Sequence, residues 1–155
     1  MNLSRAKILL TSLLLLVLAA IPRQADAKRT PVPRIYMFGF AASLNDSIVH
    51  FTDIQPVDSA WIETRNGFLL GRENYSYQLR DYIAHNLGLP HRTCIVVYAM
   101  KKEKLEKKFI KLRQRYTKVS RKIPACDVRY IGSADFTFQP IDMSVEESAP
   151  EETKK

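Results

Sequence analysis

Short apolar runs alternate with polar turns along the first part of the chain, and they predict an opening pair of strands. Residues 35–42 (IYMFGFAA) are almost wholly apolar, which is typical of a central strand. Gly39 inside this run indicates a bulge or a close approach of another segment. A turn signal at residues 44–47 precedes a second strand at 48–54, so we expect an antiparallel hairpin.

Two later segments repeat their apolar residues at helical spacing. The pattern predicts one helix over 75–87, which Gly88 would end, and a second helix over 101–118 with one narrow apolar stripe. A continuous β-branched run at 93–100 separates the two helices and is typical of a strand covered on both faces. An alternating run at 126–131 predicts the last strand of the main series.

Two stretches give weaker patterns. Residues 55–72 favour an irregular segment, although a small hairpin of 60–63 and 68–70 around the turn at 66–67 is the alternative. Residues 136–138 (FTF) indicate a short edge strand.

This order of elements, β-β-α-β-α-β, predicts a two-layer α+β sandwich within a single domain over residues 35–142. It has a mixed sheet of about four strands, with both helices on one face. The strands at 35–42 and 93–100 are apolar on both sides, so a second sheet face would then need a cover. Residues 55–72 or a second copy of the protein, in a homodimer, are the candidates for that cover.

The ends of the chain differ in composition from this domain. Residues 1–27 carry a short basic start, an apolar run and a small-x-small site, which together predict a signal peptide and a secreted or periplasmic protein. No later apolar run is long enough to span a bilayer. Residues 28–34 are expected to be an extended, mobile lead-in, and residues 143–155 a disordered acidic tail.

The net charge of +8 is concentrated in one segment. The predicted leader accounts for +2, which leaves about +6 for the mature chain. Residues 101–122 hold eleven basic residues against Glu103 and Glu106, a local excess of +9. Such a balance favours anionic partners.

The basic segment is therefore the candidate binding site. Its members are Lys104, Lys107, Lys108, Lys111, Arg113, Arg115 and Lys118. An anionic glycan, a lipid head group or an acidic protein fits the predicted compartment, whereas secretion and the lack of exposed aromatic residues disfavour nucleic acid. A solvated helix face without a partner is the plain alternative, and docking of the acidic tail on the helix is another.

Cys94 and Cys126 lie near the starts of two predicted strands that one crossover joins. If these strands are adjacent, the two thiols lie at the same edge of the sheet, and an oxidising compartment favours a disulfide over two buried thiols. His91 lies close to Cys94 in sequence, but no third orienting group or local motif indicates a thiol enzyme. No spacing of ligands predicts a metal site, and no cofactor motif is present.

These patterns favour a small non-enzymatic binding module that docks on an anionic partner through its basic helix. A structural subunit that dimerises through the second sheet face is the alternative. A small hydrolase or thiol enzyme is the least favoured, since it would need a pocket that gathers His91, Cys94 or paired carboxylates.

Overall fold

The computed structural model describes residues 29–118 and 126–144. Within them lie six strands and two helices: β1 (Arg29–Ala42), β2 (Ile48–Thr52), β3 (Gln55–Glu63), β4 (Phe68–Leu69), α2 (Arg72–Asn86), β5 (Thr93–Ala99), α3 (Lys102–Thr117) and β6 (Asp127–Ile131). The predicted α+β class with a mixed sheet is confirmed, with six strands in place of about four. No helix in the described part of the chain is long and apolar enough to cross a bilayer.

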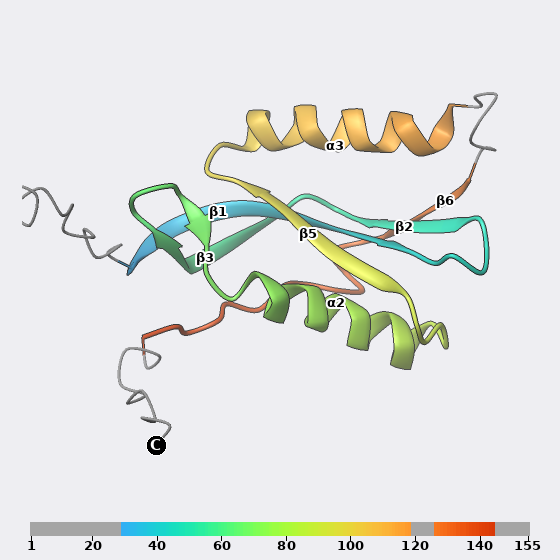
Figure 1. The fold of residues 1–155 in the computed structure, drawn as a ribbon, viewed down its shortest axis with the longest axis horizontal. Coiled ribbons are helices and arrows are strands. Elements are labelled where there is room, and N and C mark those ends of the chain that lie inside the picture. Colours follow the sequence, from blue (N-terminus) through green and yellow to red (C-terminus); the bar gives the residue numbers. More distant parts are fainter. Residues whose placement is uncertain (1–28, 119–125, 145–155) are drawn as a thin grey trace, which may run out of the picture.

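The long strand β1 is the spine of the sheet (Figure 1). Its first half pairs with β3, and its second half lies between β2 and β5, all in antiparallel register. Beyond them, β4 pairs with β3 in antiparallel register and β6 pairs with β2 in parallel. The strands β5 and β6, which α3 connects, are therefore separated by β1 and β2.

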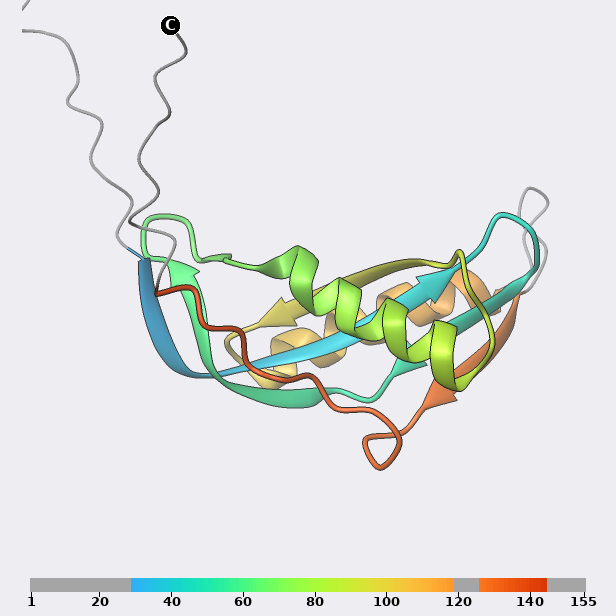
Figure 2. The same cartoon turned by 90° about the horizontal axis from the view of Figure 1, so that it is seen from below.

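The two helices cover opposite faces of the sheet, so the prediction that both lie on one face is wrong (Figures 1 and 2). Each helix has its own core cluster. Tyr75, Leu79 and Ile83 of α2 pack on one face, and Leu105 with Phe109 of α3 pack on the other. A strand that is apolar on both sides is thus buried within one chain. The second sheet face needs no partner copy, and the observation that motivated a dimer falls away.

Aromatic rings fill the core beneath α3. Phe109 meets Phe38 and Phe51 edge to face, with ring centroids 5.0 and 5.4 Å apart. Tyr116 lies 4.8 Å from Phe40 further along the helix. Edge-to-face pairs of this kind contribute about 0.5–1.5 kcal/mol beyond their buried area. The apolar stripe of α3 is therefore fixed to the sheet, which turns its basic residues outward.

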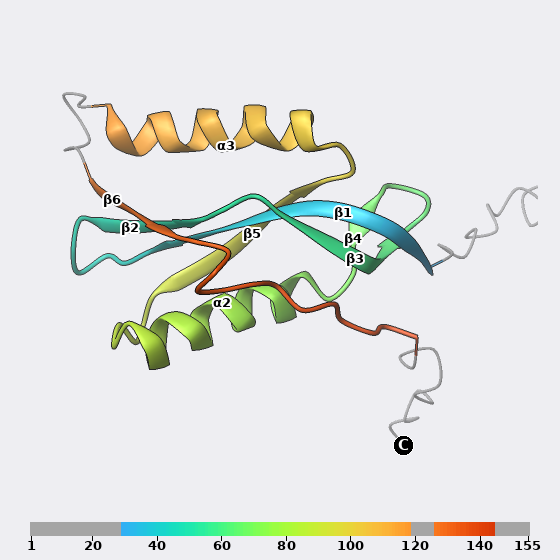
Figure 3. The same ribbon diagram turned by 180° about the vertical axis from the view of Figure 1, so that it is seen from behind.

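The segment after β6 runs along α2 and completes the opposite face (Figure 3). It is not the predicted edge strand, because amide side chains replace a strand ladder. The buried Gln55 donates to the Phe136 carbonyl at 2.7 Å and accepts from the Phe138 N–H at 3.0 Å. Gln78 and Gln139 form a similar reciprocal pair. Phe136 and Phe138 are thereby held in the core.

Two other expectations need correction. The predicted mobile lead-in at 28–34 belongs, from Arg29 onward, to β1. Residues 55–72 form the hairpin of β3 and β4 and not an irregular segment. The predicted leader at 1–27 and residues 145–155 of the predicted acidic tail lie outside the described residues.

Candidate functional site

The basic residues of α3 are not spread evenly around the helix. At roughly 100° per residue, five of them fall within an arc of about 80°, and they span about 21 Å of helix length. This basic row consists of Lys104, Lys108, Lys111, Arg115 and Lys118, all exposed. Lys107 lies at its margin and is exposed too.

Arg113 does not share this surface. It lies on the opposite flank of the helix, where it is half-buried, so the structure separates it from the other six predicted residues. Both acidic residues of the helix, Glu103 and Glu106, also lie away from the row. Within the described residues, the helix's one ion pair joins Lys102 to Glu106 at 4.0 Å, and the row takes no part in it. Among the residues that the structure describes, the row thus presents cationic side chains without a carboxylate to neutralise them.

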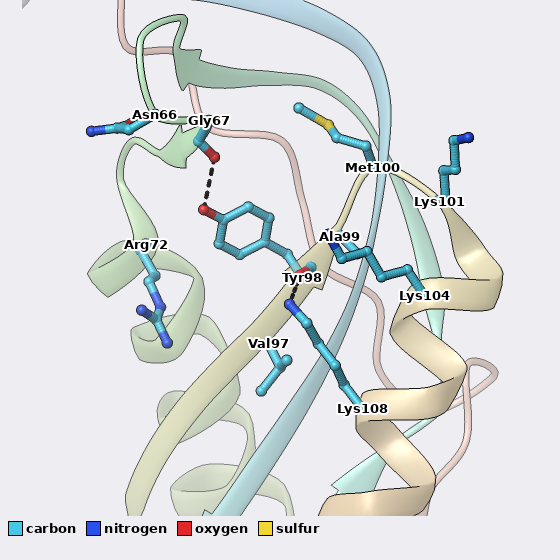
Figure 4. A pocket seen from close by; sticks show the side chains of 10 residues that line it. All are labelled: Asn66, Gly67, Arg72, Val97, Tyr98, Ala99, Met100, Lys101, Lys104 and Lys108. Atoms are coloured by element: carbon cyan, nitrogen blue, oxygen red, sulfur yellow. Dashed lines mark hydrogen bonds between the residues drawn. The ribbon is translucent and has the colours of Figure 1, made fainter.

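The row leads into a groove of about 520 Å³ between the two helices. Residues 97–100 form its floor, at the outer edge of β5 (Figure 4). Lys104 and Lys108 form one wall, with Lys101 at its rim and its side chain directed away, and Arg72 of α2 faces them from the other wall. Four cationic residues line this groove, and no carboxylate of the described residues does, which makes it a favourable place for a negatively charged group.

Hydrogen bonds fix the position of the groove walls. The Tyr98 hydroxyl donates to the Gly67 carbonyl at 2.9 Å and accepts from the Leu69 N–H at 2.9 Å, which ties the β3–β4 hairpin to β5 (Figure 4). Lys108 Nζ donates to the Tyr98 carbonyl at 3.1 Å, and an Arg72 Nη donates to the Val96 carbonyl at the same distance. Two of the four cations are therefore oriented by the strand edge. Sequence reasoning missed Arg72, because only the strand order brings α2 next to this edge.

The predicted disulfide between Cys94 and Cys126 is wrong. No bridge joins the two residues, which pack into core clusters on opposite faces of the sheet. With β1 and β2 between their strands, the thiols are three strand spacings apart, about 14 Å. A disulfide needs Cα atoms within about 7 Å.

Cys94 also lacks the properties of a nucleophile. Burial raises the pKa of its thiol to about 11, whereas a reactive cysteine needs a lowered pKa. Its Sγ donates to the Arg92 carbonyl, and the neighbouring His91 has an exposed side chain. No hydrogen bond in the described part of the chain joins His91 to Cys94.

The carboxylates that are candidates for a catalytic pair have separate structural partners. Asp53 accepts from the Ser133 N–H, Glu63 from the Asn66 side chain, and Asp81 from Arg80. Among the described residues, no three His, Cys, Asp or Glu side chains gather in a way that could hold a metal ion.

A second polar cluster lies at the far end of the sheet, around His50. Arg92 is almost fully buried and donates to the Ile48 carbonyl and to Asp46, both at 2.7 Å, which fastens the β1–β2 turn to the start of β5. Burial, with the charges of Arg92 and Arg129 nearby, lowers the pKa of His50. His50 therefore lies uncharged beside the contacts of Arg92, and it lines a hollow of about 300 Å³.

Comparisons with family models, curated proteins and solved structures find no significant match. The chemistry of the surface itself therefore carries the functional argument.

Proposed function

We propose that this protein is a non-enzymatic binding module that docks on an anionic partner through the basic row of α3. The observation that carries the proposal is the arrangement of Lys104, Lys108, Lys111, Arg115 and Lys118. They form one exposed line without acidic neighbours among the described residues, on a helix that aromatic packing holds against the sheet. A row of fixed cations binds a polyanion because the partner meets several charges at once and releases its counterions.

The partner classes that suit this surface are an anionic glycan, a lipid head group or an acidic protein. We include export in the proposal, because the leader-like residues 1–27 would place the protein where such partners occur. A solvated helix face is the competing explanation of the same charges. It does not explain why Arg72, from another helix, extends the positive potential into the groove.

Retention on immobilised heparin tests the proposal. Changing Lys104, Lys108, Lys111 and Arg115 to glutamine removes four charges from the row, and we expect this variant to elute in the low-salt wash. The matched control changes four basic residues elsewhere to glutamine: Lys102, Arg113, Arg65 and Arg80.

Both variants have the same net charge, so non-specific ion exchange would weaken them equally. Loss of retention in the row variant alone supports docking through α3. Equal retention of the two variants would refute it. Circular dichroism of each variant shows that the fold is kept.

A further inference from the structure

The outer edge of β5 forms the floor of the groove, and no strand of the described part of the chain lies beside it. Among the described strands, β5 pairs only with β1. In an antiparallel pair, alternate residues turn both main-chain groups toward the neighbouring strand and the others turn theirs away. Val96 and Tyr98 turn theirs away from β1, since their carbonyls accept from Arg72 and Lys108. Their N–H groups therefore point out of the same edge. Tyr98 lines the groove, whereas Val96 is fully buried and its main-chain groups open to the groove only when Arg72 leaves the Val96 carbonyl.

Side chains cover this edge only in part. Natural sheets protect open edges with lysine, and Lys108 has that effect here. Protection of two carbonyls, however, accounts for two of the four cationic residues that line the groove. Lys104, whose side chain reaches toward the strand edge, makes no hydrogen bond to it in the described part of the chain. The surplus positive charge indicates a ligand that is both negatively charged and able to pair with a strand.

We propose that the groove binds an extended acidic polypeptide, which adds to β5 as a further strand. This inference rests on the proposed function and narrows its partner to one class. The incoming main chain would donate to the Val96 and Tyr98 carbonyls and accept from their N–H groups. Lys108, displaced from the Tyr98 carbonyl, would pair with a carboxylate of the incoming strand, and Arg72, displaced from the Val96 carbonyl, would meet the side chains on the other face of that strand.

The positions of the walls define the sequence that fits. Side chains of a strand point alternately to the two faces of its sheet, so those of the added strand alternate between α3 and α2. One set would meet Lys104 and Lys108, and the other would meet Arg72. An alternating acidic peptide places a carboxylate toward the lysine wall at every second residue, about 6.6–6.8 Å apart. A globular anion or a single phosphate would use the charges but leave the main-chain groups of the edge unpaired.

The test compares two fluorescent peptides of equal charge by anisotropy at low salt. The first is a seven-residue peptide of alternating glutamate and threonine, and the second has the same sequence with every internal amide N-methylated. N-methylation removes the donors that strand addition needs and leaves the carboxylates in place. We expect the methylated peptide to bind at least about tenfold more weakly. The pair Lys104→Gln with Lys108→Gln should weaken the parent peptide, whereas the control pair Lys102→Gln with Arg113→Gln should not.

Amide hydrogen exchange gives a second readout that does not depend on a variant. The parent peptide should slow exchange at Val96 and Tyr98, and the methylated peptide should not. Equal binding of both peptides, or unchanged exchange at these amides, would overturn strand addition. Heparin retention that still depends on the basic row, without peptide binding, would leave the proposed function standing and reject this inference alone.

The chain contains an acidic sequence of its own, which makes it a competitor to test. Residues 145–155 include four glutamates, and Met143 lies beside Gly71 at the start of α2, next to the groove. A chain that ends at Ser144 should bind the parent peptide more tightly and the methylated peptide no more tightly, in support of the inference. Equal tightening of both peptides would reflect only the charge of the lost glutamates and would count against it.

Discussion

Gly39 is the point where the sheet, α2 and the final segment come closest together, and replacing it with alanine tests that packing. A Cβ at this position would lie 2.5 Å from Cδ2 of Leu79 and 3.2 Å from both Cζ of Phe138 and Cγ2 of Thr52. All three side chains are buried, so none can move into solvent. Overpacking of this kind costs about 1–3 kcal/mol.

The change also has a favourable part, because alanine restricts the unfolded chain by about 0.4–1 kcal/mol more than glycine does. We therefore expect Gly39→Ala to lower the free energy of unfolding by about 1–2 kcal/mol. Gly132→Ala is the matched control. Its Cβ would have its nearest contact at 3.6 Å, from Asp135 Oδ2, which is ordinary van der Waals distance.

Urea unfolding followed by circular dichroism measures both variants, and a shared m value shows that the comparison is valid. A Gly39→Ala protein as stable as the wild type, or changed only as much as Gly132→Ala, would refute the close approach of α2 to β1. The arrangement of the helices on opposite faces would then lose its most direct packing argument.

Three further outcomes follow from the same structure. Folding lowers the pKa of His50 from 6.5, so between the folded and the unfolded pKa values the unfolded chain binds more protons than the folded protein. The free energy of unfolding should therefore fall on acidification through that range, by up to about 1.4 kcal/mol per pH unit. His50→Gln should flatten this slope in urea unfolding measured at several pH values. Tyr98→Phe removes two hydrogen bonds to the β3–β4 hairpin, so we expect a loss of about 1–3 kcal/mol and faster amide exchange at Leu69, and unchanged exchange there would contradict that link. Protein unfolded without reductant should take up two alkyl groups at Cys94 and Cys126 by mass spectrometry, whereas a disulfide would block both.

The local elements could be predicted because each has a clear repeat in the sequence. The apolar stripe of α3, with Leu105 and Phe109 one turn apart, fixes both the helix and the face that it buries. Gly88 adopts the left-handed conformation (φ 63°) expected just after the end of α2. Gly39 in an apolar strand predicts a bulge or a close approach, and the structure has the close approach.

The arrangement of these elements depends on strand order, which the spacing of apolar residues along the chain does not encode. The crossover through α3 has a preferred hand, but nothing local says that two strands lie between β5 and β6. The disulfide prediction for Cys94 and Cys126 failed for that reason. The apolar residues on both sides of β1 indicate that both faces of the sheet are covered. A helix on each face explains this pattern directly, without a cover from residues 55–72 or from a second copy of the protein.

Two other errors have identifiable physical causes. Pro31 and Pro33 made the start of β1 resemble a mobile lead-in. The partner β5 begins to pair only at Tyr36, so this part of β1 is an edge, where proline is tolerated. The extended segment around Phe136 and Phe138 resembled a strand because its burial alternates, but Gln55 satisfies its main chain in place of a ladder.

The basic row was visible in the sequence, whereas the groove was not. Helical spacing alone places Lys104 and Lys108 on one side of α3. Arg72 joins them through folding, since it precedes Lys104 by more than thirty residues and lies on another helix. Arg113 shows why composition alone does not define the binding surface. Its charge counts toward the local excess of +9, but its side chain lies on the opposite flank of α3 from the basic row.

A titration of the isotope-labelled protein with a sulfated hexasaccharide, followed by amide chemical shifts, tests the binding surface most directly. Docking on the basic row predicts that the shifts concentrate on residues 104–118 and on the groove at 97–101, and that added salt reverses them. Shifts centred on the flank of Arg113 or on the hollow beside His50, or spread evenly over the molecule, would contradict it.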